Sequence, residues 1–142
     1  MAKKALLVGI TGASGSNYAL RFLQRLQQMD QPVEAIFSEV GKRVFEYETG
    51  VRVEEVSKLA RRIYDPSDFF SPPASGSSSY LGMVIIPCSM GTLSAIANGS
   101  SINLIHRAAD VMLKERKPLI LVVRETPLNL VHLENMLKVT KA

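Results

Sequence analysis

Disulfide bonds within this chain are excluded, because Cys88 is its single cysteine. A lone cysteine is typical of a reducing compartment, and the sequence has neither a signal-like leader nor an apolar run long enough to cross a bilayer. Tryptophan is absent, histidine occurs twice, and no spacing of His, Cys, Asp and Glu is typical of a metal site. We therefore expect a cytoplasmic protein that holds no metal.

Charge is not concentrated in any one tract. The 17 lysines and arginines exceed the 13 aspartates and glutamates, for a net charge of +4, but they are scattered along the chain. A nucleic-acid partner is therefore not indicated, whereas a small basic surplus suits ligands that carry phosphate. The chain is long enough for a sizeable core, and without repeats or linkers we expect residues 1–142 to form a single domain.

A glycine-rich turn follows the first apolar segment. Residues 5–10 are almost all apolar, residues 11–16 are Thr-Gly-Ala-Ser-Gly-Ser, and apolar residues recur at helical spacing over 18–26. This order predicts a strand, a turn and a helix, with Ser14 or Ser16 capping the helix. The free N–H groups of such a helix would face a phosphate or another anionic group. A tight turn that binds nothing is the alternative.

The rest of the chain alternates strands and helices in the same way. The pattern predicts strands at 33–37, 81–87 and 118–123, helices at 40–48, 51–63, 93–97, 102–114 and 130–139, and loops at 64–68 and 72–79. This alternation predicts an α/β fold, a three-layer Rossmann- or flavodoxin-like parallel sheet with helices on both faces. Ligands of such sheets bind beyond the carboxyl ends of the strands, where turns 11–16, 88–92 and 124–127 would meet. The last helix reaches the final residue without a stop signal, so we expect the C-terminal part of the fold to be missing.

A dinucleotide-binding fold is the first competitor. The turn has the spacing Gly9-x-x-Gly12-x-x-Gly15 instead of Gly-x-Gly-x-x-Gly. The second predicted strand ends at Ser38, where an acid would bind the ribose, although Glu39 follows directly. The case for a nicotinamide reductase is weakened by this, and a hydroxyl at Ser38 suits a phosphate or a ring carbonyl.

Several short motifs are spread over essentially the whole chain. They are Gly12-Ala13-Ser14-Gly15, Ser38, Glu48-Thr49, Pro73-Ala74-Ser75-Gly76-Ser77, Pro87-Cys88-Ser89-x-x-Thr92-Leu93-Ser94, Arg107-Ala108-Ala109-Asp110-Val111-x-Leu113-Lys114-Glu115-Arg116, Pro118-Leu119 and Arg124-Glu125-Thr126-Pro127. Together they closely resemble the flavin prenyltransferases. These enzymes belong to a wider group of homo-oligomeric flavin-binding proteins that includes cysteine decarboxylases.

This resemblance implies an activity and its partners. The family transfers a dimethylallyl group from dimethylallyl monophosphate to N5 and C6 of reduced flavin mononucleotide (FMN), without a metal. The prenylated FMN serves a partner decarboxylase, for example in ubiquinone synthesis. Family members form homo-oligomers, often dodecamers, with sites at subunit contacts. They also continue past the point where this chain stops, with a Tyr and a Lys or Arg that bind the donor phosphate.

The resemblance also implies site residues, by motif position. The residues expected to hold FMN are Gly12, Ala13, Ser14, Ser38, Ser89, Met90, Gly91, Thr92 and Arg124. The residues expected around the donor phosphate are Ser75, Gly76, Arg107, Lys114 and Arg124, and the catalytic ones are Ser14, Glu48, Lys114 and Glu125. Their chemistry agrees, because Arg and Lys stabilise a departing phosphate and a carboxylate can steady positive charge or move a proton.

Two further alternatives keep the same fold. One is a non-catalytic FMN carrier or assembly subunit. The other is a flavin-dependent decarboxylase, which would need an early catalytic histidine, whereas the first histidine here is His106. His106 and His132 lie among apolar neighbours and are expected to be packing or surface residues. Cys88 follows a buried strand without a histidine partner, so we expect it to belong to the core.

Overall fold

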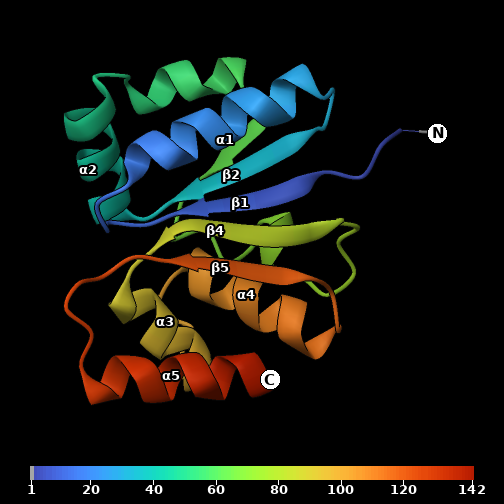
Figure 1. Ribbon diagram of the computed structural model, residues 1–142. Coiled ribbons are helices and arrows are strands. Elements are labelled where there is room, and N and C mark those ends of the chain that lie inside the picture. Colours follow the sequence, from blue (N-terminus) through green and yellow to red (C-terminus); the bar gives the residue numbers. More distant parts are fainter. Residues whose placement is uncertain (1) are drawn as a thin grey trace.

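A computed structural model describes residues 2–142, which form a parallel sheet between two layers of helices (Figure 1). The strands are β1 (Leu6–Ile10), β2 (Val33–Phe37), β3 (Arg62–Tyr64), β4 (Gly82–Cys88) and β5 (Leu119–Val123), in the sheet order β3-β2-β1-β4-β5. The α-helices are α1 (Ser16–Gln28), α2 (Glu39–Thr49), α3 (Met90–Ala97), α4 (Leu104–Lys114) and α5 (Leu130–Lys141). Two 3₁₀ helices, η1 (Val53–Lys58) and η2 (Pro72–Ala74), complete the fold. The predicted three-layer α/β fold is confirmed.

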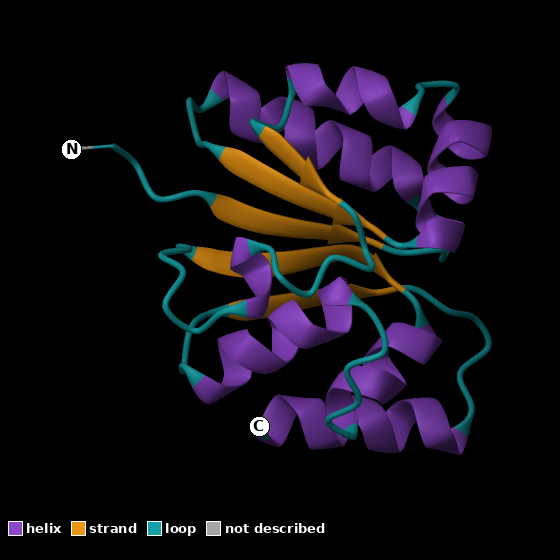
Figure 2. Ribbon diagram, turned by 180° about the vertical axis from the view of Figure 1, so that it is seen from behind, coloured by secondary structure: helices purple, strands orange, loops and turns teal. Residues whose placement is uncertain are grey.

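The central strands are apolar because both faces of the sheet are covered. Val8 of β1 belongs to a buried cluster with Leu23 of α1, on the face that α1, α2 and η1 cover. Its neighbour Leu7 points to the opposite face and packs with Ile105 of α4. Successive side chains of a strand point to opposite faces, so a continuous apolar run such as β4 is what a doubly covered strand requires. Figure 2 shows the two helical layers from behind the sheet.

Side-chain caps start most of the helices after the first. The side chains of Ser38, Ser89, Asn103 and Asn129 accept backbone N–H groups at the starts of α2, α3, α4 and α5. At the other end of α2, Gly50 terminates the helix in the left-handed region with φ 70°. These caps fix where each connection leaves the sheet and therefore where the turns of the site lie.

The segment 51–63 differs from its predicted helix. It forms the 3₁₀ helix η1 and then enters the edge strand β3, which the sequence analysis assigned partly to a helix and partly to a loop. Val53 and Val56 are three residues apart, a spacing that fits three residues per turn as well as it fits an α-helix. β3 has only three residues, of which Arg62 is exposed, so it carries almost no strand pattern.

A buried carboxylate ties three segments together at the amino ends of the strands. Glu34 of β2 accepts hydrogen bonds from the hydroxyls of Tyr80 at 2.6 Å and Tyr64 at 2.8 Å. Arg61 pairs with the same carboxylate at 2.8 Å. Glu34 is only 7% exposed, so these partners supply the hydrogen bonds that water would otherwise give. The cluster holds β2, β3 and the segment before β4 in one register.

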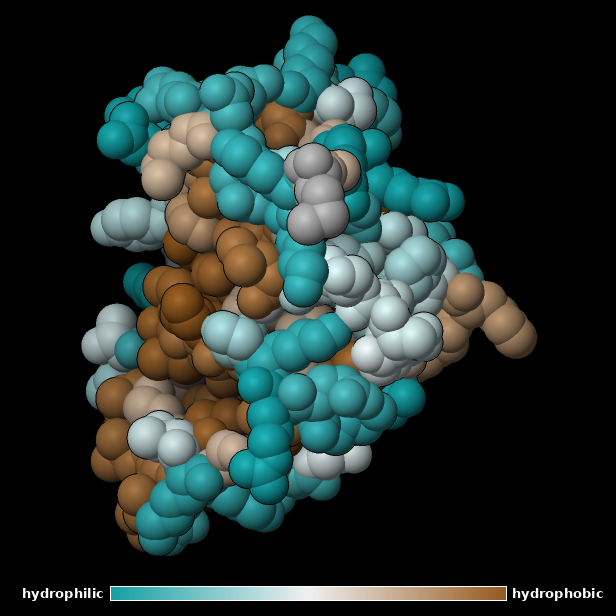
Figure 3. Space-filling model, turned by 90° about the vertical axis from the view of Figure 1, so that its right-hand side faces the viewer, coloured by the Kyte–Doolittle hydropathy of each residue, from teal (hydrophilic) through white to brown (hydrophobic). Residues whose placement is uncertain are grey.

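Apolar side chains remain exposed along β5 and α5. They are Ile120, Val122, Val123, Leu130, Val131, Leu133 and Leu137. Figure 3 shows brown, apolar surface gathered on one flank of the molecule. A separate cavity of about 590 Å³ lies between β5, α3 and α5, and Leu121 and Met136 are among its lining residues. Within residues 2–142 no helix is both long and apolar enough to cross a membrane.

Candidate active site at the carboxyl edge of the sheet

The turns after β1, β4 and β5 meet at one edge of the sheet, as predicted. In Figure 1 all three lie on the left, where the strands end. The backbone N–H of Ser89 donates to the hydroxyl of Thr11 at 2.9 Å, which joins the first two turns. The backbone N–H of Arg124 donates to the carbonyl of Cys88 at 3.1 Å, which joins the third. Hydrogen bonds therefore fix all three turns relative to one another.

A carboxylate occupies the start of α1, which differs from the predicted serine cap. The N-cap is Gly15, with φ 120°, and it makes no side-chain cap. Instead Glu48, from the end of α2, accepts the N–H groups of Gly15 at 3.1 Å and Ser16 at 3.0 Å. The hydroxyl of Ser14 donates to the same carboxylate at 2.6 Å. In this structure the protein's own anion takes the place that the sequence analysis gave to a phosphate or another anionic group.

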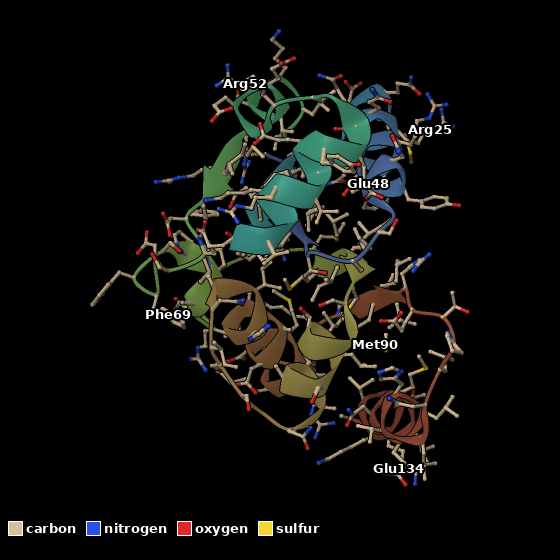
Figure 4. All side chains as sticks on the ribbon, turned by 90° about the vertical axis from the view of Figure 1, so that its left-hand side faces the viewer. Arg25, Glu48, Arg52, Phe69, Met90 and Glu134 are labelled. Atoms are coloured by element: carbon tan, nitrogen blue, oxygen red, sulfur yellow. The ribbon has the colours of Figure 1, made fainter. Side chains whose placement is uncertain are left out.

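These hydrogen bonds change the pKa of Glu48. The hydrogen bonds from Ser14 and from the N–H groups of Ser16 and Gly15 hold the pKa of this carboxyl below its ordinary value of 4.5. Glu48 is therefore ionised at neutral pH, a state in which a carboxylate can accept a proton or serve as a fixed negative charge. Figure 4 looks onto this edge and shows Glu48 beside the first turn of α1.

The start of α3 offers free donors instead. Ser89 caps this helix by accepting the N–H of Thr92 at 3.2 Å. Among the residues described, no acceptor lies on the N–H groups of Met90 and Gly91. Apart from its chain neighbours and the backbone of its own helix, none of the described residues has a heavy atom within 4 Å of where a Cβ on Gly91 would be, so packing does not require a glycine there. Free N–H groups and open space fit an anionic or carbonyl-bearing ligand such as a flavin.

Ser38 lies at the end of β2, next to these turns. Its N–H donates to the carbonyl of Ile10 at 3.0 Å, and its hydroxyl accepts the N–H of Gly41 at 2.9 Å. A cavity of about 330 Å³ begins at Ser38 and reaches Phe69 and Ile102. The hydroxyl is thus held by α2 at the mouth of a cavity with partly apolar walls, which suits the ring of a flavin.

The predicted phosphate residues fall into two groups. Arg124 follows β5 at the carboxyl edge, together with Glu125, and both side chains are exposed. Arg107 lies on α4, where its Nε donates to the carbonyl of Ala74 in η2 at 3.2 Å. Lys114 ends α4 and pairs with Glu115, and a Cβ at Gly76 would overlap both side chains.

The second group, which contains Arg107, Lys114 and Gly76, extends along α4 and away from the three turns. This helix starts beside Pro66, just after β3, and ends before β5, so it runs from the carboxyl edge to the amino edge. Its 11 residues span about 16 Å at 1.5 Å per residue. Within one chain, Lys114 and Gly76 therefore lie at the opposite end of α4 from Arg124. The residues predicted for the phosphate do not form one cluster in a single copy.

Some residues that build the site carried no usable sequence signal. Thr11 is buried and joins two turns, and Gly41 lets α2 approach β1, because an added Cβ would overlap the carbonyl oxygen of Ile10. Gly12, which the sequence did predict for the site, likewise lies against Val40 of α2. These contacts join residues far apart in the sequence, so only their residue types, small or hydroxyl-bearing, hinted at them.

Cys88 and the two histidines lie outside this chemistry. Cys88 is fully buried, and burial raises the pKa of its thiol to about 12, so it stays protonated at neutral pH. His106 is buried in α4, and burial lowers its pKa, while His132 is half-buried and completes a capping box with Asn129. Within residues 2–142 no three His, Cys, Asp or Glu side chains gather as metal ligands would.

Comparison with known proteins agrees with the motifs. The flavoprotein family model matches residues 1–142. The flavin prenyltransferase UbiX of Methanocaldococcus jannaschii is 50% identical over 135 residues, covering 95% of this chain and 73% of that protein. AnUbiX, crystallised with FMN and dimethylallyl pyrophosphate, is 40% identical with a TM-score of 0.96, covering 99% of this chain and 74% of that one.

A second solved structure has the same fold. The dodecameric FMN-dependent UbiX-like decarboxylase from Escherichia coli is 41% identical with a TM-score of 0.94, covering 96% of this chain and 75% of that one. Identity of this level over nearly the whole chain is far above what a shared fold alone requires. The chain belongs to the flavoprotein family and, within it, to the flavin prenyltransferases, which are transferases.

Proposed function

We propose that this chain takes a dimethylallyl group from dimethylallyl monophosphate and joins it to N5 and C6 of reduced FMN. The allylic C–O bond breaks, the phosphate leaves with the electron pair, and the allylic carbon forms its bond to N5. N5 gives up its proton as this bond forms. The remaining double bond then takes up a proton, its tertiary carbon forms the bond to C6, and C6 releases its proton. We expect the prenylated FMN to pass to a partner decarboxylase, as the resemblance implies.

The observation that carries this proposal is the joining of three turns around an ionised Glu48. The turn that bears Ser14, the start of α3 and the end of β5 are connected by hydrogen bonds. At this edge, the start of α3 offers free N–H groups and open space at Gly91, and the start of α1 carries the Glu48 carboxylate. A flavin held by the start of α3 would present its ring to the Glu48 carboxylate.

The chain's residues have separate roles in this scheme. Reduced FMN supplies the nucleophilic atoms, and Gly12, Ala13, Ser38, Ser89, Met90, Gly91 and Thr92 hold it. Ser14 and Glu48 lie where a proton can be accepted during ring closure, because the carboxylate is ionised and bonded to the hydroxyl. Arg124 and Glu125 follow β5 at the same edge and complete the site, the first as a cation for phosphate and the second as a further carboxylate.

A second copy of the chain supplies the remaining cations. Arg107 and Lys114 line α4 with Ser75 and Gly76 and cannot reach the three turns of their own chain together. A homo-oligomer brings this group to the site of a neighbour, where two cations stabilise the leaving phosphate. Dodecameric assembly of the related Escherichia coli protein supports this arrangement.

The proposal also covers the domain organisation and the cellular location of the protein. Residues 1–142 act as one flavin-binding domain built on a single sheet. We place the protein in the cytoplasm, as expected from its lone cysteine. Neither a metal nor a nucleic acid takes part in the proposed reaction.

The test is a mass measurement on the flavin. Anaerobic incubation of the protein with reduced FMN and dimethylallyl monophosphate should give a flavin heavier by one prenyl group. The saturated analogue isopentyl monophosphate is the matched control and should give no product, because its C–O bond cannot ionise to an allylic cation. An unchanged flavin mass in protein that binds FMN would contradict the transfer, and failure to bind FMN would contradict the flavin site.

A further inference from the structure

Thr11 is buried at the junction of the turns that follow β1 and β4. It is the first residue after β1 and is only 1% exposed. Its hydroxyl donates to the carbonyl of Pro87 at 2.6 Å and accepts the N–H of Ser89 at 2.9 Å. Both of its hydrogen-bonding capacities are therefore used on the end of β4.

The reason that a side chain is needed here lies in the strand pairing. The register of β1 and β4 runs from Leu6 opposite Gly82 to Gly9 opposite Ile85. Two residues beyond Ile85 comes Pro87, which has no N–H to donate to the ladder. The backbone N–H of Thr11 still donates to the carbonyl of Pro87 at 3.3 Å, and the hydroxyl of Thr11 carries the pairing one step further by offering the acceptor that the N–H of Ser89 requires.

Ser89 in turn defines where α3 begins. Its side chain accepts the N–H of Thr92, while its own N–H is held by Thr11. A continuous series of hydrogen bonds thus runs from Thr11 to the first turn of α3. This turn carries the free N–H groups of Met90 and Gly91. Thr11 also directly precedes Gly12, at the start of the turn that bears Ser14.

We propose that Thr11 is a positioning residue, whose hydroxyl fixes the β1 turn relative to the start of α3 so that both hold one FMN at the same time. The proposal rests on the proposed flavin site. Without the hydroxyl, the part-buried N–H of Ser89 loses its acceptor, and the start of α3 moves away from β1 to find water. Only a fraction of the molecules then has both turns in the conformation that binds FMN, and the apparent affinity for FMN falls in proportion to that fraction.

The test compares a substitution that removes the hydroxyl of Thr11 with one that keeps it. Thr11→Val keeps the shape and removes the hydroxyl, and it should raise the Kd for FMN on the order of tenfold, because the competent fraction falls by about that factor. Thr11→Ser keeps the hydroxyl and should stay within about twofold of the wild-type Kd. Thr140→Val, on the exposed face of α5, makes the same chemical change away from the site and should leave the Kd unchanged.

Two readouts separate positioning from a general loss of stability. In Thr11→Val the KM for reduced FMN should rise while the KM for the allylic donor stays constant, and an irreversibly unfolded fraction would lower the apparent kcat and change neither KM. Urea unfolding checks that reversible global unfolding is too rare to account for the rise, because it would weaken binding by the same population effect. Hydrogen exchange of residues 88–92, measured without flavin, should be faster in Thr11→Val than in Thr11→Ser.

Three results would overturn the inference. They are a wild-type Kd in Thr11→Val, an equal loss in Thr11→Ser, or unchanged exchange at residues 88–92. If the wild-type protein itself binds no FMN, the proposed function fails. The exchange measurement still decides whether Thr11 fixes the two turns.

Discussion

The carboxylate of Glu48 accepts the hydroxyl of Ser14 at 2.6 Å and thereby closes the start of α1 with a residue from the end of α2. The same carboxylate takes the N–H groups of Gly15 and Ser16. The donors at the start of α1 that a phosphate could use are therefore occupied by the protein's own carboxylate. This arrangement also places an ionised acid at the position where the turn meets the rest of the site.

The first prediction concerns acid stability. Because the folded-state pKa of Glu48 lies below its ordinary value of 4.5, its stabilisation is complete above that pH and is lost as the pH falls further. We expect Glu48→Gln to lower the free energy of unfolding by about 1 kcal/mol at neutral pH, a typical value for a partly exposed cap. Urea unfolding should show the difference from wild type shrinking below pH 4.5. A constant difference down to strong acid would contradict the role of the charge.

The second prediction contrasts two glycines. Gly91→Ala should leave the melting temperature unchanged or slightly raised, because the added Cβ meets no atom within 4 Å and alanine favours a helix by up to about 1 kcal/mol. It should weaken FMN binding, because the methyl group fills the space proposed for the ligand. Gly41→Ala should do the opposite and destabilise the fold by about 1–3 kcal/mol, since its Cβ would overlap the carbonyl of Ile10. Calorimetry and flavin fluorescence titration measure both effects.

The third prediction tests whether the site is shared between subunits. Glu48→Gln and Lys114→Ala should each lower kcat/KM about 10²-fold, the usual scale for losing one proton-transfer or charge-stabilising group. Coexpression of the two variants should restore part of the activity, because some hybrid sites combine an intact Glu48 with an intact Lys114. No recovery in verified mixed oligomers would show that both residues serve the same copy.

The fourth prediction concerns the buried carboxylate at the amino ends of the strands. Burial alone would raise the pKa of Glu34, but the hydrogen bonds from Tyr80 and Tyr64 and the charge of Arg61 lower it below 4.5. We expect Glu34→Ala to lower the free energy of unfolding by about 3 kcal/mol, because two hydroxyls lose their acceptor. Tyr80→Phe should cost about 1–2 kcal/mol.

The control for this cluster is flavin binding. Glu34 lies on β2 at the end opposite Ser38, so its variants should bind FMN with the wild-type Kd once folded. A change in Kd larger than the change in stability would place the cluster in the binding machinery instead.

The fifth prediction concerns Cys88. Because burial raises the pKa of its thiol to about 12, a maleimide should label the folded protein very slowly at neutral pH. Labelling should accelerate with urea in step with unfolding. Cys88→Ala should retain prenyl transfer, and a large loss of transfer in folded protein would give the thiol a role in catalysis.

Most of the sheet was predictable, because β1, β2, β4 and β5 are short apolar runs bounded by Gly, Pro or Ser. The meeting of the three turns followed from the strands, since parallel strands place their carboxyl ends at one edge of the sheet. β3 was not, because its three residues carry no alternation, and the preceding Val53–Lys58 segment has a spacing shared by 3₁₀ and α helices.

The internal contacts of the site were beyond sequence reasoning. The serine cap was wrong because a carboxylate 33 positions from Gly15 competes for the same N–H group and carries a full charge. Thr11 was overlooked because its partners are 76 and 78 positions away. The division of the predicted phosphate residues along α4 depends on the direction of that helix, which only the topology defines.

The pairing of β1 with β4 has a consequence for folding. The inner edge of β1 finds no partner until the chain has been synthesised past Pro87, 76 positions after Thr11. Such distant contacts form slowly, because the loop between them must be closed first. We expect β1, β2 and the helix between them to assemble early during translation, while the binding edge takes shape only after the centre of the sheet is complete.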